Sequence, residues 1–130
     1  MKENLNFLFE IPVKIMERAI KFYESVFNIK LSRKMLDFPT GTVDMACFPE
    51  SDEQPGQNGA LIYQSKTLNT PGDAMVYLNS RFNNIEQELA RVEKQGGVIL
   101  TPKTFISKVI GYMATFVDSE GNKVSLMSKK

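Results

Sequence analysis

Few side chains in this sequence could do chemistry, and Glu10 is the most notable of them. It is a carboxylate inside an apolar stretch, LNFLFEIPV, at residues 5–13. Apolar neighbours exclude water and disfavour the charged form of a carboxylate, which is one way in which general bases are tuned. Glu10 could therefore be a general base or the partner of a ligand cation. It could also be a glutamate at the rim of a cleft that water, Lys or Arg satisfies.

Three further polar residues, Tyr77, Asn79 and Ser125, are candidates of the same kind. Tyr77 could be an acid, a hydrogen-bond donor or a stacking surface, or it could simply fill space. Asn79 could contact a ligand or bond to backbone at a strand end. Ser125 has no neighbouring base in the sequence pattern, so we do not expect it to be a nucleophile. Cys47, within the apolar segment ACF, is expected to be an inert buried thiol.

The composition excludes many kinds of enzyme. The 130 residues contain no His and one Cys. Without His there can be no Ser-His-Asp triad, no Cys-His pair and no His-containing metal site. A single Cys excludes an intramolecular disulfide framework and a Cys-cluster metal site. The remaining chemistry must rest on carboxylates, hydroxyls and amides.

Charge and hydropathy narrow the possible partners. Lys and Arg number 16 against 15 Asp and Glu, and no run of five basic residues occurs, so we expect no nucleic-acid partner. No apolar run is long enough to span a membrane, and Glu3 and Glu10 interrupt the first apolar stretch, which argues against a signal peptide. We therefore expect a single domain over residues 1–130 that contacts no membrane and works in a reducing cytoplasm.

Periodicity defines the elements that must position these residues. Residues 5–13 alternate with period two, which predicts a strand with Phe7, Phe9, Ile11 and Val13 on one face and Leu8 and Glu10 on the other. A helical stripe follows, made of Met16, Ala19, Ile20, Tyr23, Val26 and Phe27. Arg18 and Lys21, with Glu17 and Glu24, are interpreted as the solvated face of this helix.

The second half of the chain repeats this order. Residues 74–79 predict a strand with Val76 and Leu78 in the core and Tyr77 and Asn79 on the other face. Asn83 or Asn84 is expected to cap the next helix, with Glu86 or Gln87 completing a capping box. Ile85, Leu89 and Val92 form its apolar stripe, Gly96-Gly97 end it, and a strand follows at residues 98–100.

A shift of the chain by 69 residues superposes the two patterns. It places Leu8 on Tyr77 and Ile20 on Leu89, which predicts two copies of a βαβββ unit at about residues 4–65 and 73–128. Residues 65–73 form the linker, and residues 49–59 form a long polar loop in the first copy. In the second copy the corresponding turn, residues 118–122, is short. Its Asp118, Gly121 and Asn122 are interpreted as turn-forming residues.

Several segments together carry a family resemblance. FEIPV, RAIKFYESVF, NGALIY, VYLN, a helix ending in GG, and GYMATFVDSEGNKVSL follow one another in this order. The chain resembles the glyoxalase/bleomycin resistance/dioxygenase group, the vicinal oxygen chelate superfamily. The resemblance implies an α+β fold in which two tandem βαβββ modules form a U-shaped, eight-stranded mixed sheet around a cleft. It also implies a homodimer, with modules paired within one chain or exchanged between chains.

The resemblance further implies where a metal would bind in metal-dependent members. The implied ligand positions are Leu8, Leu61 (to within about one residue), Tyr77 (or Val76) and Ser125. Leu, Leu, Tyr and Ser do not build a carboxylate or imidazole site for a hard divalent cation. We therefore predict no metal and no other cofactor. Ile15 stands where relatives often have an Asp, so the first helix is expected to lack a side-chain cap.

The same resemblance indicates which residues line the cleft. The predicted ligand-binding residues are Leu8, Glu10, Leu61, Tyr77, Asn79 and Ser125, with Met127 beside them. Of these, Glu10 and Tyr77 are the catalytic candidates. Met35, Met45 and Met113 could form an adaptable apolar binding surface, or they could fill the core.

These observations favour a metal-free protein that binds or sequesters a small, partly apolar molecule. The alternative is an enzyme: a glyoxalase-like lyase or isomerase, or a dioxygenase, either metal-dependent or using Glu10 as general base. A third possibility is a structural partner in a larger complex, which predicts a large exposed apolar patch.

Overall fold

A computed structural model of the chain describes residues 8–39, 41–49, 58–64, 75–80 and 84–130. The first unit consists of β1 (Leu8–Pro12), α1 (Met16–Phe27), β2 (Ser32–Phe38), β3 (Gly41–Cys47) and β4 (Asn58–Gln64). The second consists of β5 (Met75–Asn79), α2 (Ile85–Lys94), β6 (Val98–Ser107), β7 (Gly111–Val117) and β8 (Lys123–Ser128). The predicted α+β fold of two tandem βαβββ units is confirmed.

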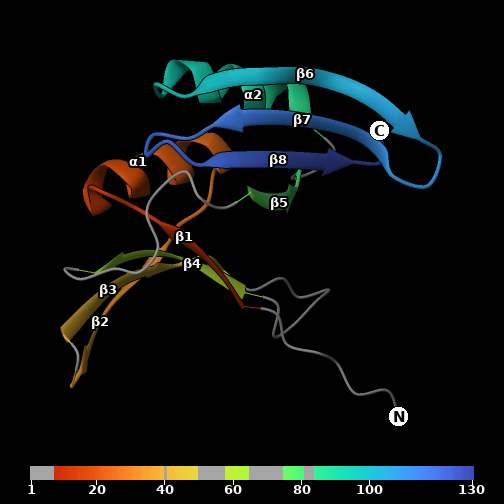
Figure 1. Cartoon of the computed structure of the whole chain (residues 1–130). Helices are drawn as coiled ribbons and strands as arrows, with labels where there is room; N and C mark the ends of the chain where they lie inside the picture. Colours follow the sequence, from red (N-terminus) through yellow and green to blue (C-terminus); the bar gives the residue numbers. More distant parts are fainter. Residues whose placement is uncertain (1–7, 40, 50–57, 65–74, 81–83) are drawn as a thin grey trace, which may run out of the picture.

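The eight strands are hydrogen-bonded as two mixed sheets of four. Sheet A has the order β1-β4-β3-β2, and sheet B has the order β5-β8-β7-β6. In each sheet one pair is parallel, β1 with β4 and β5 with β8, and the other pairs are antiparallel. In Figure 1 sheet B lies at the top, sheet A lies at the lower left, and α1 lies between them.

Strand β1 has the predicted alternation. Ile11 and Val13 are buried, Phe9 packs partly against the core, and Glu10 is exposed on the other face. Strand β5 behaves alike, with Val76 buried and Tyr77 60% exposed. Period-two patterns therefore placed both strands in the correct phase.

Helix α1 buries more of its surface than one stripe. Five residues of the expected stripe are buried, Ile20 is half-buried, and Phe22, which the stripe did not include, is 1% exposed. Phe22 contacts Phe116 of β7 with 6.0 Å between ring centroids. The helix is therefore in contact with both units, which widens its buried side beyond a single stripe.

The start of α2 differs from the expected capping box. Asn84 is the N-cap residue, but its side chain makes no cap hydrogen bond to the helix. Its Nδ2 donates instead to Oε1 of Gln87 at 2.7 Å, and its backbone N–H donates to Oγ of Ser80 at 2.9 Å. The N-cap position was predicted correctly, and the box was wrong because the Asn84 amide bonds to a side chain instead of to backbone.

The end of α2 is the predicted glycine cap. The N–H of Gly96 donates to the carbonyl of Glu93 at 3.2 Å, and that of Gly97 donates to the carbonyl of Val92 at 2.9 Å. These are the two bonds of a Schellman motif. Gly96 has φ +91°, a left-handed conformation that favours glycine.

Strand β6 is longer than the three residues expected, because it runs from Val98 to Ser107. Its pairing with β7 shifts register near residues 99–104, a stretch that contains Pro102. Such irregularities accommodate a proline that cannot donate to the ladder. The β7–β8 turn closes as predicted, with the N–H of Asp118 donating to the carbonyl of Asn122 at 2.8 Å.

Both sheets pack against one shared core. A single cluster of buried apolar residues includes Ile11, Ala46 and Leu61 from sheet A, both helices, and Ala114, Phe116 and Leu126 from sheet B. Arg91 of α2 also donates from Nε to the carbonyl of Val26 in α1 at 2.7 Å. Each sheet therefore turns its helix-covered face inward, and its other face, called here its open face, turns outward.

Some expectations fall on residues that are outside the described part of the chain. They concern Phe7, Asn83, the linker at 65–73 and most of the loop at 49–59. Among the described residues, neither helix is long and apolar enough to cross a membrane.

Candidate functional site

The open face of sheet A carries one of the predicted site residues, Glu10. The register places Glu10 beside Ala60 and Ala60 beside Cys47, in one row across three strands. The next row holds Pro12, Ile62 and Met45. The fourth strand, β2, adds Ser32 beside Cys47 and Lys34 beside Met45, so this face joins a carboxylate and an ammonium group to an apolar and sulfur-containing surface. The side chain of Leu8 lies outside the described part of the chain.

The open face of sheet B carries three predicted site residues. Tyr77 pairs with Ser125, Ser125 pairs with Thr115, and Thr115 pairs with Thr101. Four hydroxyl side chains thus form a row across all four strands. Ser125 is 2% exposed, and its Oγ lies 3.1 Å from Oγ1 of Thr115. The neighbouring residues of the row shield Ser125, whereas Tyr77 on the edge strand remains exposed.

A second row lies beside the hydroxyl row. It consists of Asn79, Met127, Met113 and Thr104. These two rows contain no charged side chain. They can donate and accept neutral hydrogen bonds, and the two thioethers can pack on an apolar or aromatic surface.

Leu61 does not lie on an open face. It pairs with Ile11, is fully buried, and belongs to the shared core. Neighbouring residues in a strand point to opposite faces, so a one-residue difference in alignment exchanges core and open face. Ala60 and Ile62, one residue to either side, are the β4 residues on the face of Glu10.

The sulfur-containing residues divide between these surfaces. Met45 lies on the open face of sheet A and Met113 on that of sheet B, whereas Met35 pairs with Asp44 on the inner side and is 62% exposed. Cys47 is only partly buried, so the expectation of a buried thiol needs correction. Its side chain lies on the outward face, which the helices do not cover.

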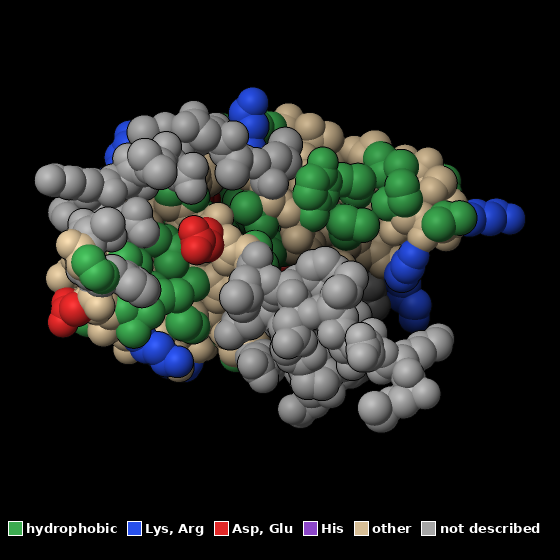
Figure 2. Space-filling view, turned by 60° about the horizontal axis from the view of Figure 1, so that its bottom comes forward, with side chains coloured by type: hydrophobic (Ala, Val, Ile, Leu, Met, Phe, Trp, Pro, Cys, Tyr) green, Lys and Arg blue, Asp and Glu red, His purple; other side chains and the backbone are tan. Residues whose placement is uncertain are grey.

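The predicted site residues are thus brought together only in part. Tyr77, Asn79 and Ser125 share one face, and Glu10 lies on the other sheet. Figure 2 shows one side of the molecule, with one group of hydrophobic side chains toward the sheet A end and another toward the β6–β7 end. Because both open faces look away from one core, they do not face each other within the chain.

The residues present do not fit the divalent metal of the metal-dependent relatives. Of the four implied positions, Leu61 is in the core, and Tyr77 and Ser125 belong to a row of neutral hydroxyls. Across the described ranges, no three Cys, Asp or Glu side chains are grouped so that they could hold an ion. Neutral hydroxyls are weak ligands for a hard cation compared with carboxylates.

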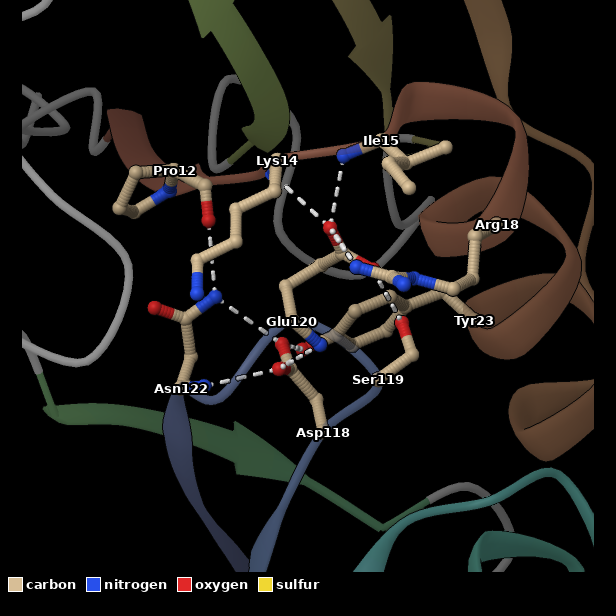
Figure 3. Close-up of polar contacts among 9 residues, drawn as sticks. All are labelled: Pro12, Lys14, Ile15, Arg18, Tyr23, Asp118, Ser119, Glu120 and Asn122. Atoms are coloured by element: carbon tan, nitrogen blue, oxygen red, sulfur yellow. Dashed lines mark hydrogen bonds and ion pairs between the residues drawn. The ribbon is translucent and has the colours of Figure 1, made fainter.

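A buried polar cluster, which the sequence patterns did not predict, joins the two units. Glu120, in the β7–β8 turn, accepts hydrogen bonds from the backbone N–H groups of Lys14 and Ile15, both at 2.8 Å (Figure 3). Its carboxylate also accepts from Nε of Arg18 at 2.6 Å. The prediction that Arg18 is only part of a solvated face was therefore wrong. Arg18 forms an ion pair with Glu120, and its side chain is 47% exposed.

Asp118 and Asn122 extend this cluster. The hydroxyl of Tyr23 donates to Oδ2 of Asp118 at 2.6 Å, and the N–H groups of Glu120 and Asn122 donate to Oδ1 at 2.8 and 2.9 Å (Figure 3). Nδ2 of Asn122 donates to the carbonyl of Pro12 at 2.8 Å. Residues 118–122 do form a turn, as predicted, and in addition they hold the β1–α1 corner in place.

Electrostatics follow from these contacts. Burial alone raises the pKa of Glu120, but hydrogen bonds from Arg18, Ile15, Lys14 and Ser119 outweigh it and leave that pKa below its ordinary value. Burial, together with the charge of Asp118, raises the pKa of Tyr23 well above 10.0. One signal of this cluster was present in the sequence. Ile15 cannot cap the helix with its side chain, so the free N–H groups at the helix start need an acceptor from elsewhere in the chain.

A separate groove of about 720 Å³ runs along the outer side of α1 to the start of β2. Its charges are largely compensated within the groove, because Arg33 pairs with Glu17 at 3.1 Å and Lys30 lies 3.9 Å from Glu24. None of the predicted site residues lines it.

The fold and the two open faces define a two-module α+β protein, and comparison with known proteins identifies its family. Residues 6–126 match the Glyoxalase/Bleomycin resistance protein/Dioxygenase superfamily, and the chain belongs to that superfamily. No curated protein matches the sequence.

Solved structures with this fold include both enzymes and binding proteins. A glyoxalase family protein from Bacillus cereus is 16% identical, with a TM-score of 0.71 over 97% of this chain and 95% of that one. An antibiotic-binding protein from a Streptomyces species is 21% identical, with a TM-score of 0.66 over 98% and 97%. Glyoxalase I from Zea mays is 26% identical, with a TM-score of 0.69 over 94% of this chain and 45% of that one. The chain therefore spans less than half of the maize enzyme.

Proposed function

We propose that this protein binds a small, partly apolar molecule on its open sheet faces and needs no metal to do so. The open face of sheet B carries this proposal, because it presents a row of hydroxyls beside a row of thioethers and an amide. Ligand sites combine an apolar lining with a few polar groups that fix orientation. The ligand would be held by neutral hydrogen bonds and by contacts to Met113 and Met127.

Other features support a binding role. The described part of the chain groups no carboxylates that would hold a catalytic ion. The Streptomyces protein of the same fold is an antibiotic-binding protein, an analogy at the level of the fold. A cytoplasmic homodimer with a small-molecule ligand remains our prediction for this member of the superfamily.

Native mass spectrometry of protein purified without chelator or affinity metal tests the proposal. We expect a species without a stoichiometric divalent ion, and a retained organic mass that denaturation releases. A stoichiometric divalent ion would contradict the metal-free assignment. If no organic mass is retained, the fluorescence of 8-anilinonaphthalene-1-sulfonate provides a second test. An increase that Met113→Glu abolishes supports binding on this face, and no increase with wild-type protein overturns the proposal.

A second candidate function is a metal-free isomerase or lyase that uses Glu10 as general base. Its specific support is that Glu10 is exposed on the open face of sheet A, beside the apolar residue Ala60. Within the described part of the chain, no ion pair involves this carboxylate. A base must be free to reach the proton that it abstracts.

A further inference from the structure

We infer that the ligand of this site is an amphipathic anion and that Lys123 is the residue that selects it. The ammonium group of Lys123 would bind an acidic group at one end of the ligand. The hydroxyl and thioether rows of sheet B would contact the uncharged remainder. This inference rests on the proposed function, because it names the class of molecule that the open face of sheet B takes.

Lys123 lies on the same open face as the proposed site. It stands two residues before Ser125 in β8, and residues two apart in a strand point to the same side of the sheet. Val124, between them, is fully buried, whereas Lys123 is exposed. Lys123 pairs with Val117 of β7, and Val117 pairs with Val98 of β6. A third row of residues therefore runs alongside the hydroxyl row.

The charge of this face comes from one residue. In the three rows, the register brings together hydroxyl, amide, thioether and apolar residues, and Lys123 is the only charged residue among them. Lys103, in β6, is engaged with the helix layer, where its ammonium nitrogen lies 3.3 Å from a carboxylate oxygen of Glu86. The open face of sheet A differs, because it carries both Glu10 and Lys34. The three rows of sheet B therefore offer a positive charge without a negative one.

Lys123 has no carboxylate partner in an ion pair within the described part of the chain. The acidic residues nearest to it in the sequence, Asp118 and Glu120, are buried and bonded to other groups (Figure 3). Asp118 accepts a hydrogen bond from the phenol of Tyr23, and Glu120 accepts one from Arg18. The ammonium group of Lys123 is therefore available to an anion from solution, with which it would form a charge-assisted hydrogen bond.

The spacing along β8 indicates the shape of the ligand. Lys123, Ser125 and Met127 follow one another at intervals of about 6.6 Å, since a strand advances about 3.3 Å per residue. Over this length the face changes from a cation, through neutral hydroxyls, to the thioethers of Met113 and Met127. A molecule about 13 Å long, with an acidic group at one end and an aromatic or other apolar body, would contact all three rows.

Electrostatics would also exclude the opposite class of ligand. A cation on this face would meet the positive charge of Lys123, and no carboxylate in the three rows would compensate the repulsion. A neutral ligand would leave the ammonium group in water and lose only the ion pair. The face should therefore discriminate most strongly against cations and more modestly against neutral molecules.

Two fluorescent probes with the same ring system test the inference. One is 8-anilinonaphthalene-1-sulfonate, and the other is N-phenyl-1-naphthylamine, which has the same rings without the sulfonate. The dissociation constant of each probe is measured for wild type, Lys123→Met and Lys123→Arg. Lys94→Met is the matched control, because it removes the same charge from an exposed position of α2 and not from the open face.

We expect Lys123→Met to weaken binding of the sulfonate probe about fivefold, the effect of one partly exposed ion pair, and that of the neutral probe by less than about twofold. Lys123→Arg should retain the wild-type affinities because it keeps the charge, and Lys94→Met should change neither. Salt screens an exposed ion pair, so added NaCl should weaken binding of the sulfonate probe to wild type more than to Lys123→Met.

A sulfonate affinity that Lys123→Met leaves intact, or an equal loss for both probes, would overturn the inference and leave the proposed function standing. A retained compound without an acidic group, found by native mass spectrometry, would do the same. A retained acid whose occupancy Lys123→Met does not lower would also overturn the inference alone. If wild type binds neither probe and retains no compound, the proposed function fails, and this inference fails with it.

Discussion

The backbone N–H of Ile15 donates to a carboxylate oxygen of Glu120, 105 residues further along the chain, at 2.8 Å. Ile15 is the N-cap residue of α1, and its own side chain cannot accept a hydrogen bond. Glu120, from the second unit, instead accepts from the N–H of the N-cap residue, as the glutamate of a capping box does, and its negative charge also suits the positive end of the helix dipole. The start of α1 therefore depends on the β7–β8 turn.

Removal of this carboxylate should weaken the fold. Glu120→Ala would leave the N–H groups of Lys14 and Ile15 and the guanidinium of Arg18 without their acceptor. We expect the free energy of unfolding to fall by about 2–3 kcal/mol, because the hydrogen bonds that are lost are made to a charged group. Urea denaturation measures it. Glu17→Ala, which removes an exposed carboxylate from the same helix, should change the midpoint little, and an equal loss in both variants would contradict this role.

Acid should remove the contribution of Glu120. Its pKa lies below the ordinary 4.5 in the folded protein, so the folded state holds the proton less tightly than the unfolded state does. The stabilisation is therefore complete above about pH 4.5 and is lost as the pH falls through the folded value. The stability difference between wild type and Glu120→Gln, measured in urea from about pH 6 to 3, should shrink below pH 4.5. A difference that does not change over this range would exclude the linkage.

The phenol of Tyr23 should also contribute to stability. Tyr23→Phe deletes the buried hydrogen bond to Asp118 but leaves that carboxylate its backbone N–H partners. We expect a loss of about 1–2 kcal/mol. Tyr77→Phe is the matched control, since Tyr77 is 60% exposed, and it should change stability by less than about 0.5 kcal/mol. Thermal unfolding followed by circular dichroism compares the two variants.

Glu10→Gln separates a binding protein from an enzyme. The change removes a negative charge at an exposed position, so the fold should be unaffected. For a binding protein, we expect the retained compound, quantified by native mass spectrometry, to change by less than about threefold, with its mass constant over hours. For an enzyme, wild type would convert the compound to a new mass, and Glu10→Gln would bind it unchanged. Glu86→Gln, which makes the same change at an exposed position of α2, serves as the control.

Local patterns predicted most of the fold. The alternation around Ile11 and Val76, and the stripe from Met16 to Phe27, depend only on which face of an element is buried. The repeat at 69 residues also places the N-cap residues Ile15 and Asn84 in equivalent positions. Each of these features depends on a short stretch of sequence, so each could be predicted without knowing the rest of the fold.

Long-range relationships could not be predicted in the same way. Phe22 is buried because α1 contacts Phe116 of the other unit, which no local period reveals. Leu61 was assigned within about one residue, and in a strand that uncertainty separates the core from the outward face. The sequence did not indicate that Glu120 accepts the hydrogen bonds at the start of α1, because any of the chain's acidic residues could have done so.

The two repeats satisfy the starts of their helices in different ways. The second repeat holds the start of its own helix, through Ser80 and Asn84. The start of the helix in the first repeat is held by Glu120, which belongs to the second repeat. The first repeat on its own would therefore leave the N–H groups of Lys14 and Ile15 without this acceptor, so the start of α1 depends on the presence of the second repeat.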